Sequence, residues 1–307
     1  MSLFEKKRKF SEKKLDKWEY IDEMYKEHAV LFSYSEFLKD TNISAIEISD
    51  NKVIMTFRDS GVKFLCVKND KRLAPFDTLN FGTYETEELG MQMELIENGF
   101  NIFDIGGNFG WYALHIAKKF PEAIVYSFEP IPSTYNHLNE NISLNQLKNI
   151  KTFNYGLSDE EGKFDFYFDP ELSVNASLVN VSNKENIQAI ECTVKKLDNI
   201  TEFKNLKIDF IKCDVEGAEL PAFKGAENSI RKNLPVIFTE MLRKWTSKFN
   251  YSPNDIIEFF SKFGYQCFTS EKGRLIEFEK VTEDTIETNY FFLHKEKHSG
   301  KIKEFLK

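Results

Sequence analysis

The stretch NIFDIGGNFGWYALHIAKKF, residues 101–120, decides the fold of this chain. It begins with apolar residues typical of a buried strand, continues with three glycines around Asn108, and ends in a helical pattern. Glycine lets a backbone approach a ligand closely, and a helix N-terminus offers free N–H groups. The stretch therefore predicts a strand, a tight turn and a helix that bind a nucleotide-like ligand. A turn that only packs the helix on the strand is the structural alternative.

The glycine spacing differs from that of two well-known phosphate loops. A dinucleotide site needs the pattern G-x-G-x-x-G, but counted from Gly106 the third and sixth positions are Asn108 and Trp111. A Walker loop needs Gly-Lys-Ser or Gly-Lys-Thr, which does not follow the turn. The spacing therefore disfavours a nicotinamide-dependent oxidoreductase and excludes a Walker-type nucleotide site.

The chain alternates strands and helices from residue 85 onward, which predicts an α/β fold with a mostly parallel sheet and helices on both faces. Seven strands are expected, at 101–106, 124–129, 151–156, 208–213, 235–240, 265–269 and 288–294. Helices are expected at 110–120, 133–145, 219–232 and 253–263. We expect residues 81–307 to form this domain, with an insertion at 163–194, and residues 1–80 to form a cap of helices and a β-meander.

Acidic side chains stand where three of these strands end. Glu129 ends the second strand, Asp214 follows the fourth with Glu216 two residues on, and Glu240 ends the fifth. Parallel strands end at one edge of the sheet, where open α/β sheets bind their ligands, so these carboxylates should converge. Glu129 suits the hydroxyls of a ribose. Acidic residues at a helix start are also favoured by the helix dipole, which is a purely structural reason for Glu216.

Four segments together resemble the FkbM family of S-adenosylmethionine-dependent methyltransferases: FDIGGNFGWYALHIA, SFEP, IDFIKCDVEGAELPAFKGA and PVIFTE. The dipeptide Tyr84-Glu85 in GTYETEE matches the family's usual Tyr-Glu. The resemblance covers about residues 80–295. It implies a Rossmann-like class I methyltransferase fold and methyl transfer from S-adenosylmethionine to a hydroxyl of a sugar, a glycoconjugate or a related natural product, in surface polysaccharide biosynthesis.

The resemblance also implies a set of site residues. In such a site the acidic strand end and the turn backbone hold the methionyl end of the cofactor, and the loop after the third strand lies beside the adenine. The expected cofactor-binding residues are Glu85, Asp104, Gly106, Gly107, Asn108, Phe109, Gly110, Glu129, Pro130, Ser158, Asp159 and Asp214. Ser158 and Asp159 could equally be ordinary turn residues.

A hydroxyl becomes a good nucleophile only when its proton leaves, so the enzyme needs a base within hydrogen-bond reach of it. Asp214 and Glu216 are the first candidates, and Glu240 completes the expected catalytic set; His115 is a weaker candidate. We expect no metal. A less favoured alternative is Mg²⁺ bound by Asp214 and Glu240, since carboxylate oxygens suit that ion and it would lower the pKa of the hydroxyl.

Charge and composition limit the partners. The formal net charge of −8 argues against broad binding to nucleic acid, although residues 1–17 are locally basic. A methyltransferase-like binding module that uses this basic helix, without catalysis, is therefore the alternative function. The four cysteines are scattered, and we find neither an export signal nor an apolar run long enough for a transmembrane segment, so we expect a cytoplasmic protein. Its expected partner is a small-molecule or carbohydrate acceptor; its oligomeric state stays open, a dimer included.

Overall fold

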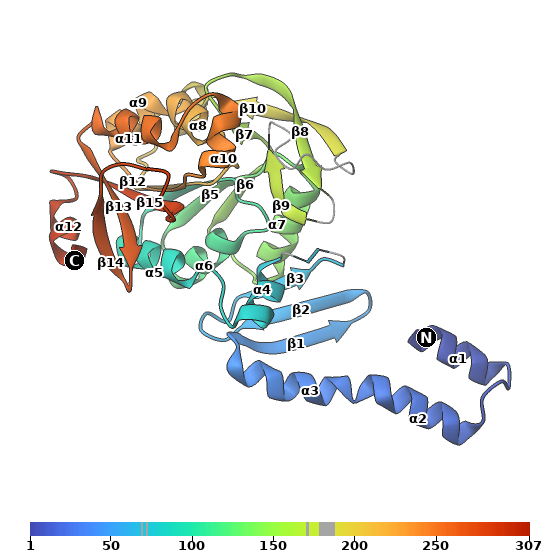
Figure 1. The fold of residues 1–307 in the computed structure, drawn as a ribbon. Helices are drawn as coiled ribbons and strands as arrows, with labels where there is room; N and C mark the ends of the chain where they lie inside the picture. The colour runs from blue at the N-terminus through green and yellow to red at the C-terminus, as the bar shows by residue number, and fades with distance from the viewer. Residues whose placement is uncertain (69, 72, 170–171, 178–187) are drawn as a thin grey trace.

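The fold is built around an eight-stranded sheet (Figure 1). The computed structural model describes residues 1–68, 70–71, 73–169, 172–177 and 188–307. In sheet order the strands are β14 Arg274–Phe278, β13 Tyr265–Glu271, β15 Asn289–His294, β12 Val236–Glu240, β11 Phe210–Cys213, β4 Asn101–Ile105, β5 Ile124–Phe128 and β6 Ile150–Phe153. The strands from β12 to β6 run parallel, and β15 is antiparallel to both β12 and β13. The predicted mostly parallel α/β sheet is therefore confirmed.

The seven expected strands are all present, and β14 is an additional strand at the edge. It forms a hairpin with β13 through Lys272 and Gly273, which both have positive φ angles of 54° and 70°. Two positive φ angles are what a type I′ hairpin turn requires, and here glycine occupies only the second of the two positions. Lys-Gly is a weaker turn signal than Asn-Gly, which explains why the sequence pattern did not reveal this strand.

Helices cover both faces of the sheet, because successive strand residues point to opposite sides. Ile102 and Phe210 belong to one buried core, while their neighbours Phe103 and Ile211 belong to the other. The first face carries α5 Thr86–Leu95, α6 Trp111–Lys119, α7 Pro132–Leu144 and α12 Ser299–Phe305. The second carries the short helices η2 Leu197–Asn199 and η3 Thr201–Phe203, with α8 Glu219–Gly225, α9 Glu227–Asn233 and α11 Pro253–Ser261. The helix expected at 219–232 is thus split at Ala226.

The insertion forms a small sheet of its own above the strand ends (Figure 1). Its strands are β7 Gly156–Leu157, β8 Gly162–Asp169, β9 Leu172–Ser177 and β10 Gln188–Lys195, in the order β7-β10-β8-β9. Residues 170–171 and 178–187 of the expected insertion lie outside the described residues. Because β7 pairs with β10, the loop that follows β6 is drawn into this small sheet.

The N-terminal region contains four α-helices, one short 3₁₀ helix and a three-stranded meander. Its elements are α1 Leu3–Ser11, α2 Lys17–His28, α3 Val30–Phe37, η1 Leu38–Asp40, β1 Ile43–Ser49, β2 Lys52–Phe57, β3 Lys63–Cys66 and α4 Ala74–Phe81. In the described parts of the chain, no helix combines the length and the apolar character needed to cross a membrane.

The meander packs against the main domain through aromatic rings and a ladder of side-chain hydrogen bonds. Phe57 lies on Trp111 with ring centroids 5.0 Å apart. The outer edge of β3 is paired by α7: Asn145 bonds both N–H and C=O of Lys63, at 2.8 and 2.7 Å, and the Asn141 Oδ1 accepts from Leu65 N at 2.9 Å. A helix thus takes the place of a fourth strand, and the meander shares one core with α6 and α7.

Candidate active site

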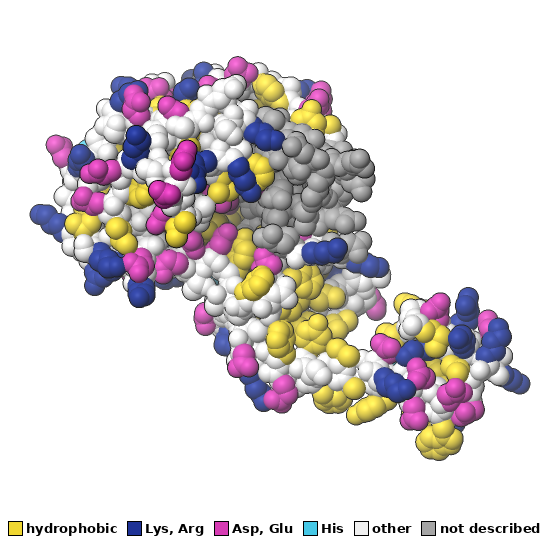
Figure 2. Space-filling view, viewed as in Figure 1, with side chains coloured by type: hydrophobic (Ala, Val, Ile, Leu, Met, Phe, Trp, Pro, Cys, Tyr) yellow, Lys and Arg dark blue, Asp and Glu magenta, His cyan; other side chains and the backbone are white. Residues whose placement is uncertain are grey.

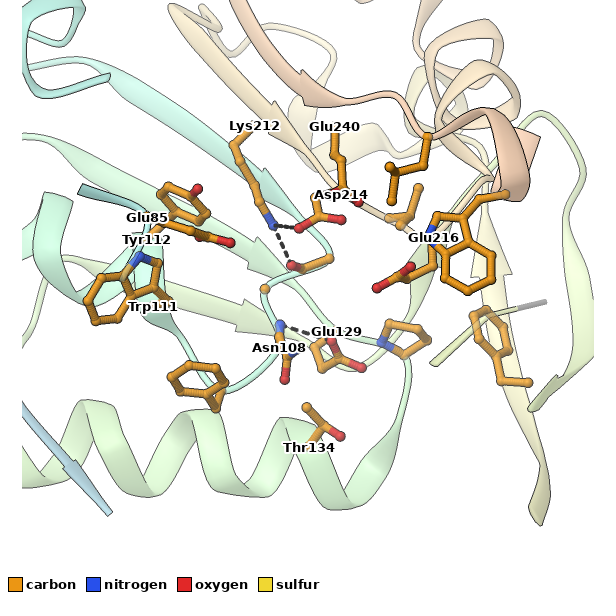
Figure 3. A pocket seen from close by; sticks show the side chains of 18 of the residues that line it. Glu85, Asn108, Trp111, Tyr112, Glu129, Thr134, Lys212, Asp214, Glu216 and Glu240 are labelled. Atoms are coloured by element: carbon orange, nitrogen blue, oxygen red, sulfur yellow. Dashed lines mark hydrogen bonds and ion pairs between the residues drawn. The ribbon is translucent and has the colours of Figure 1, made fainter. Parts of the chain in front are cut away.

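A cavity of about 380 Å³ opens at the carboxyl ends of the central parallel strands (Figure 3). The expected residues that line it are Glu85, Gly106, Gly107, Asn108, Phe109, Glu129, Pro130, Asp214, Glu216 and Glu240. The structure therefore brings together side chains that lie far apart in sequence, as the parallel topology predicts. Asp104, Gly110, Ser158 and Asp159 are not among the described lining residues.

The glycine turn lies flat against two strand ends. A Cβ atom on Gly106 would overlap the Asp214 carbonyl, and one on Gly107 would overlap the Ser127 hydroxyl. Gly106 also has a φ of +80°, which side chains rarely allow. The two glycines are needed to seat the turn between β11 and β5, whatever ligand it binds, and Gly110 begins α6 behind them.

Glu129 fastens the turn to the end of β5. Its Oε2 accepts from Asn108 N at 3.0 Å and its Oε1 accepts from Ile131 N at 2.8 Å. Burial raises the pKa of Glu129 to about 7, although these two backbone hydrogen bonds oppose the rise. Each carboxylate oxygen can accept more than one hydrogen bond, so this buried group can also bind two neighbouring hydroxyls.

Lys212 is the buried cation beneath the cavity. Its Nζ donates to the Gly106 carbonyl at 2.7 Å and lies 3.4 Å from Asp104 Oδ1 and 3.8 Å from Asp214 Oδ2. Asp104 faces Lys212 directly across the β4–β11 pair, and its other oxygen accepts from Ser127 Oγ at 2.8 Å. Burial lowers the pKa of Lys212, but Asp104 and Asp214 outweigh it and raise the pKa overall. Asp104 thus supports the turn from below through Lys212.

Asp214, Glu216 and Glu240 lie on one side of Lys212 and line the same cavity (Figure 3). Burial, followed by the charges of Asp214 and Glu216, raises the pKa of Glu240 to about 10. Burial and Asp214 likewise raise the pKa of Glu216 well above its ordinary value. The described lining residues include six carboxylates and two lysines, so the carboxylates outnumber the cations that could neutralise them. A ligand that carries positive charge fits such a cavity.

Glu85 approaches the same space from the opposite side (Figure 3). It has a φ of +42°, a left-handed conformation that a residue other than glycine keeps only where its surroundings impose it. Burial raises the pKa of Glu85 to about 7, while a hydrogen bond with Tyr112 opposes the rise. Tyr84 and Tyr112 also line the cavity, so this wall combines one carboxylate with two phenols.

The loop that holds Glu216 is fixed by Glu219 and Tyr251. Glu219 Oε1 accepts from both Val215 N and Gly217 N at 3.0 Å, and the Tyr251 hydroxyl donates to the Gly217 carbonyl at 2.7 Å. These bonds hold Glu216 at a φ of +53°. Glu219 therefore has a structural role, in the first turn of α8, where the helix dipole favours it.

Two buried polar atoms on the cavity wall have no protein partner. The amide oxygen of Asn108 and the indole nitrogen of Trp111 form no hydrogen bond within the described part of the chain. Both residues line the cavity. Buried polar groups normally find partners, so an acceptor and a donor of this kind fit a polar ligand such as the amino acid and nucleoside portions of S-adenosylmethionine.

Several lining residues were not expected from the sequence: Asp77, Trp111, Tyr112, Thr134, Val215, Leu242, Lys244 and Trp245. Lys244 and Trp245 belong to α10, four and five residues past the end of β12, so the rule that strand ends carry the site did not reach them. Ser158 packs against α8 instead of lining the cavity. Its carbonyl lies so close to Gly225 of α8 that a Cβ atom there would overlap it. Its backbone N–H donates to the Lys195 carbonyl at 3.0 Å.

The structure also bears on two alternatives raised by the sequence, His115 as the base and a metal ion at the strand ends. His115 packs among Phe57, Phe64 and Trp111 behind the cavity wall and is not itself a lining residue, and burial lowers its pKa to about 4. Within residues whose positions are described, no group of three or more His, Cys, Asp or Glu side chains is arranged to hold a metal ion.

The family model described as the methyltransferase FkbM domain matches residues 104–267, more than half of the 307-residue chain. With this match added to the strand-end site, the chain belongs to the FkbM methyltransferase family.

Individual relatives are more distant. A protein named methyltransferase 1 from Beauveria bassiana is 27% identical over 145 residues, which are 41% of this chain and 58% of that protein. Hexuronic acid methyltransferase AglP from Haloferax volcanii is 29% identical over 148 residues, 48% of this chain and 58% of its own length. This chain thus spans about three fifths of these relatives. The crystal structure of methyltransferase FkbM from Methylobacillus flagellatus superposes with a TM-score of 0.42 at 17% identity, over 65% of this chain and 45% of that one.

Proposed function

We propose that this protein transfers a methyl group from S-adenosylmethionine to a hydroxyl of a sugar, a glycoconjugate or a related natural product. The observation that carries the proposal is the group of carboxylates with raised pKa values around one cavity beside the glycine turn. S-adenosylmethionine, when bound, supplies the methyl group on a positively charged sulfur. A cation in this cavity would offset the repulsion among the carboxylates.

Particular residues support binding of this cofactor. Glu129 has the position and the spare lone pairs to accept from the ribose hydroxyls, next to the Asn108 backbone. Glu85, Asn108 and Asp214 face the space where an amino acid moiety would extend from the turn. Gly106 and Gly107 leave room for the ligand by keeping their own backbone close to the sheet.

The base that accepts the proton of the hydroxyl is, in this proposal, Glu216. Asp214 forms an ion pair with Lys212 at 3.8 Å, which ties its charge to the buried cation. Glu216 lines the cavity, and its raised pKa favours the protonated form as long as no cation is bound. The positive charge of the bound cofactor would favour ionisation, and the ionised Glu216 would then be a stronger base than an ordinary carboxylate. Glu240, with a pKa of about 10, is protonated at neutral pH and can therefore donate a hydrogen bond to the molecule that receives the methyl group.

Aromatic side chains support a sugar as the acceptor. Phe166 from β8 and Trp245 from α10 Arg243–Thr246 line the cavity, and apolar rings pack well on the C–H faces of sugars. The hexuronic acid methyltransferase among the relatives favours the same class of acceptor.

Two measurements test the proposal. Calorimetric titration should show saturable binding of S-adenosylmethionine, and transfer of a labelled methyl group should be screened over neutral sugars, uronic acids and nucleotide sugars. Glu216→Gln should keep cofactor binding and lower turnover by at least about a hundredfold, the usual contribution of a positioned base. The exposed Glu122→Gln is the matched control. Absence of binding would refute the cofactor, and full turnover of Glu216→Gln would refute the base.

A further inference from the structure

The N-terminal helices form an arm that leaves apolar side chains uncovered. The arm comprises α1, α2 and α3 and extends away from the body of the molecule beyond the meander (Figure 1). No residue of α2 or α3 is buried. Figure 2 shows hydrophobic side chains gathered along this arm and over the adjoining meander. A helix that is apolar and uncovered needs a partner, since helices of 12 and 8 residues are marginal alone in water.

Four of these side chains form one continuous stripe. Trp18, Tyr25 and Phe32 recur every seven residues, Ile21 lies between the first two, and their exposures are 72%, 61%, 67% and 41%. Ala29, which joins α2 to α3, has helical angles of −59° and −26°, so the stripe runs along one rod. A seven-residue repeat of apolar side chains is the pattern by which two helices pair along their length.

The first helix does not cover this stripe. It packs on another side of α2, where Lys6 Nζ lies 2.8 Å from Glu27 and 3.3 Å from Glu23. Phe10 stacks on Tyr20 with ring centroids 4.4 Å apart. The hairpin of α1 and α2 is therefore held by contacts of its own, and the stripe stays available to an outside partner.

The charges of the arm favour a particular partner. Residues 3–14 carry six basic and two acidic side chains, whereas residues 16–40 carry seven acidic and three basic ones. An anionic membrane or a nucleic acid on the stripe would meet the acidic segment and be repelled. A second arm, laid antiparallel on the first, brings its basic α1 to the acidic segment and its stripe to the stripe.

We propose that the partner is a second copy of this chain, and that two arms pair antiparallel along the stripe of Trp18, Ile21, Tyr25 and Phe32. The same surface then serves both copies, as in the two-fold dimers that dominate among oligomers. The aromatic side chains occupy the centre of the interface and the complementary charges its rim, which is the usual anatomy of such contacts. This inference does not depend on the proposed methyl transfer.

The test is the mass of the 307-residue chain, measured by sedimentation equilibrium over a range of micromolar concentrations. We expect a dimer for the natural chain and a monomer for the double variant Trp18→Glu/Phe32→Glu. Ile286→Glu, a change at another exposed apolar side chain far along the chain, should remain dimeric. Trp18→Ala/Phe32→Ala, which adds no charge, should raise the dissociation constant at least tenfold, and circular dichroism should show unchanged helix content.

Three results would overturn the proposal. The first is a natural chain that is monomeric at every concentration. The second is a dimer that both double variants leave intact, which would place the interface elsewhere. The third is a monomer that sediments with phosphatidylserine vesicles through the stripe, which would make the partner a membrane.

Discussion

The cavity should distinguish a charged from an uncharged cofactor increasingly well as the pH rises. Burial raises the pKa values of Glu85 and Glu129 to about 7, so both are mainly protonated at pH 6 and mainly ionised at pH 8. Ionisation makes the cavity more negative, which favours the sulfonium of S-adenosylmethionine over the neutral thioether of S-adenosylhomocysteine. The two ligands share their amino, carboxyl and ribose groups, so the ratio of their dissociation constants isolates the effect of the sulfonium charge.

The size of the effect follows from the number of carboxylates that titrate. One carboxylate about 8 Å from the sulfonium contributes about 2 kcal/mol at an effective dielectric constant of about 20. Water and Lys212 reduce this value, and two such groups titrate in the window. We therefore expect the ratio of the dissociation constant of S-adenosylhomocysteine to that of S-adenosylmethionine to rise at least about tenfold between pH 6 and pH 8. Glu240, with a pKa of about 10, ionises only above this pH range, so it raises the ratio of dissociation constants only there.

The assay is calorimetric titration of both ligands at half-unit steps of pH, in buffers of different ionisation enthalpy. Binding of S-adenosylmethionine should release protons, because the sulfonium lowers the pKa values of the carboxyls. Without ligand the same groups bind protons in the folded state, so thermal stability should fall as the pH rises from about 4.5 to about 7, and Glu240 should extend this fall toward pH 10. A ratio that stays constant over pH, with no proton release, would refute the charge argument.

Three further outcomes are expected. Glu129→Gln should weaken cofactor binding about tenfold or more, because hydrogen bonds to a charged group contribute about 1.5–3 kcal/mol; an affinity equal to that of Glu122→Gln would contradict this. Lys212→Met should lower the free energy of unfolding by about 3–5 kcal/mol, since it leaves buried carboxylates without their cation. A melting temperature equal to that of the control variant Lys207→Met, which changes an exposed lysine, would count against this role of Lys212. Exhaustive chelation with EDTA should leave turnover intact, and loss restored by Mg²⁺ would assign the strand-end carboxylates to a metal.

Local sequence patterns were enough for seven of the eight strands of the main sheet and for the residues at the strand ends of the site. The glycine turn, Glu129 and Asp214 could be placed because each follows an apolar strand, and parallel strands end at one edge. Family resemblance added Glu85, which precedes the first strand and has no positional signal of its own. Its left-handed backbone and its hydrogen bonds with Tyr84 and Tyr112 are visible only in the folded chain.

The walls of the site depended on tertiary structure. Lys244 and Trp245 reach the cavity because the chain turns into α10 right after β12, and Phe166 reaches it because the insertion folds back as a sheet. The pairing of β7 with β10 draws Ser158 toward α8, a long-range contact that a turn-like sequence does not announce. Loop positions of this kind follow from packing between distant segments, so the local pattern could not predict them.

The side-chain hydrogen bonds between β3 and α7 affect the route by which ligands can enter and leave the cavity. Asn141, Asn145 and His137 are spaced four residues apart on one side of α7, and together they make four hydrogen bonds to Lys63 and Leu65. If the meander opened away from α7 to admit ligands, these hydrogen bonds would break in every catalytic cycle. Each broken bond would cost about 0.5–1.5 kcal/mol. Ligand exchange should therefore take the opposite route, past Lys244 and Trp245 on the short helix α10, which Arg243 holds through two hydrogen bonds to the carbonyls of Thr282 and Thr285.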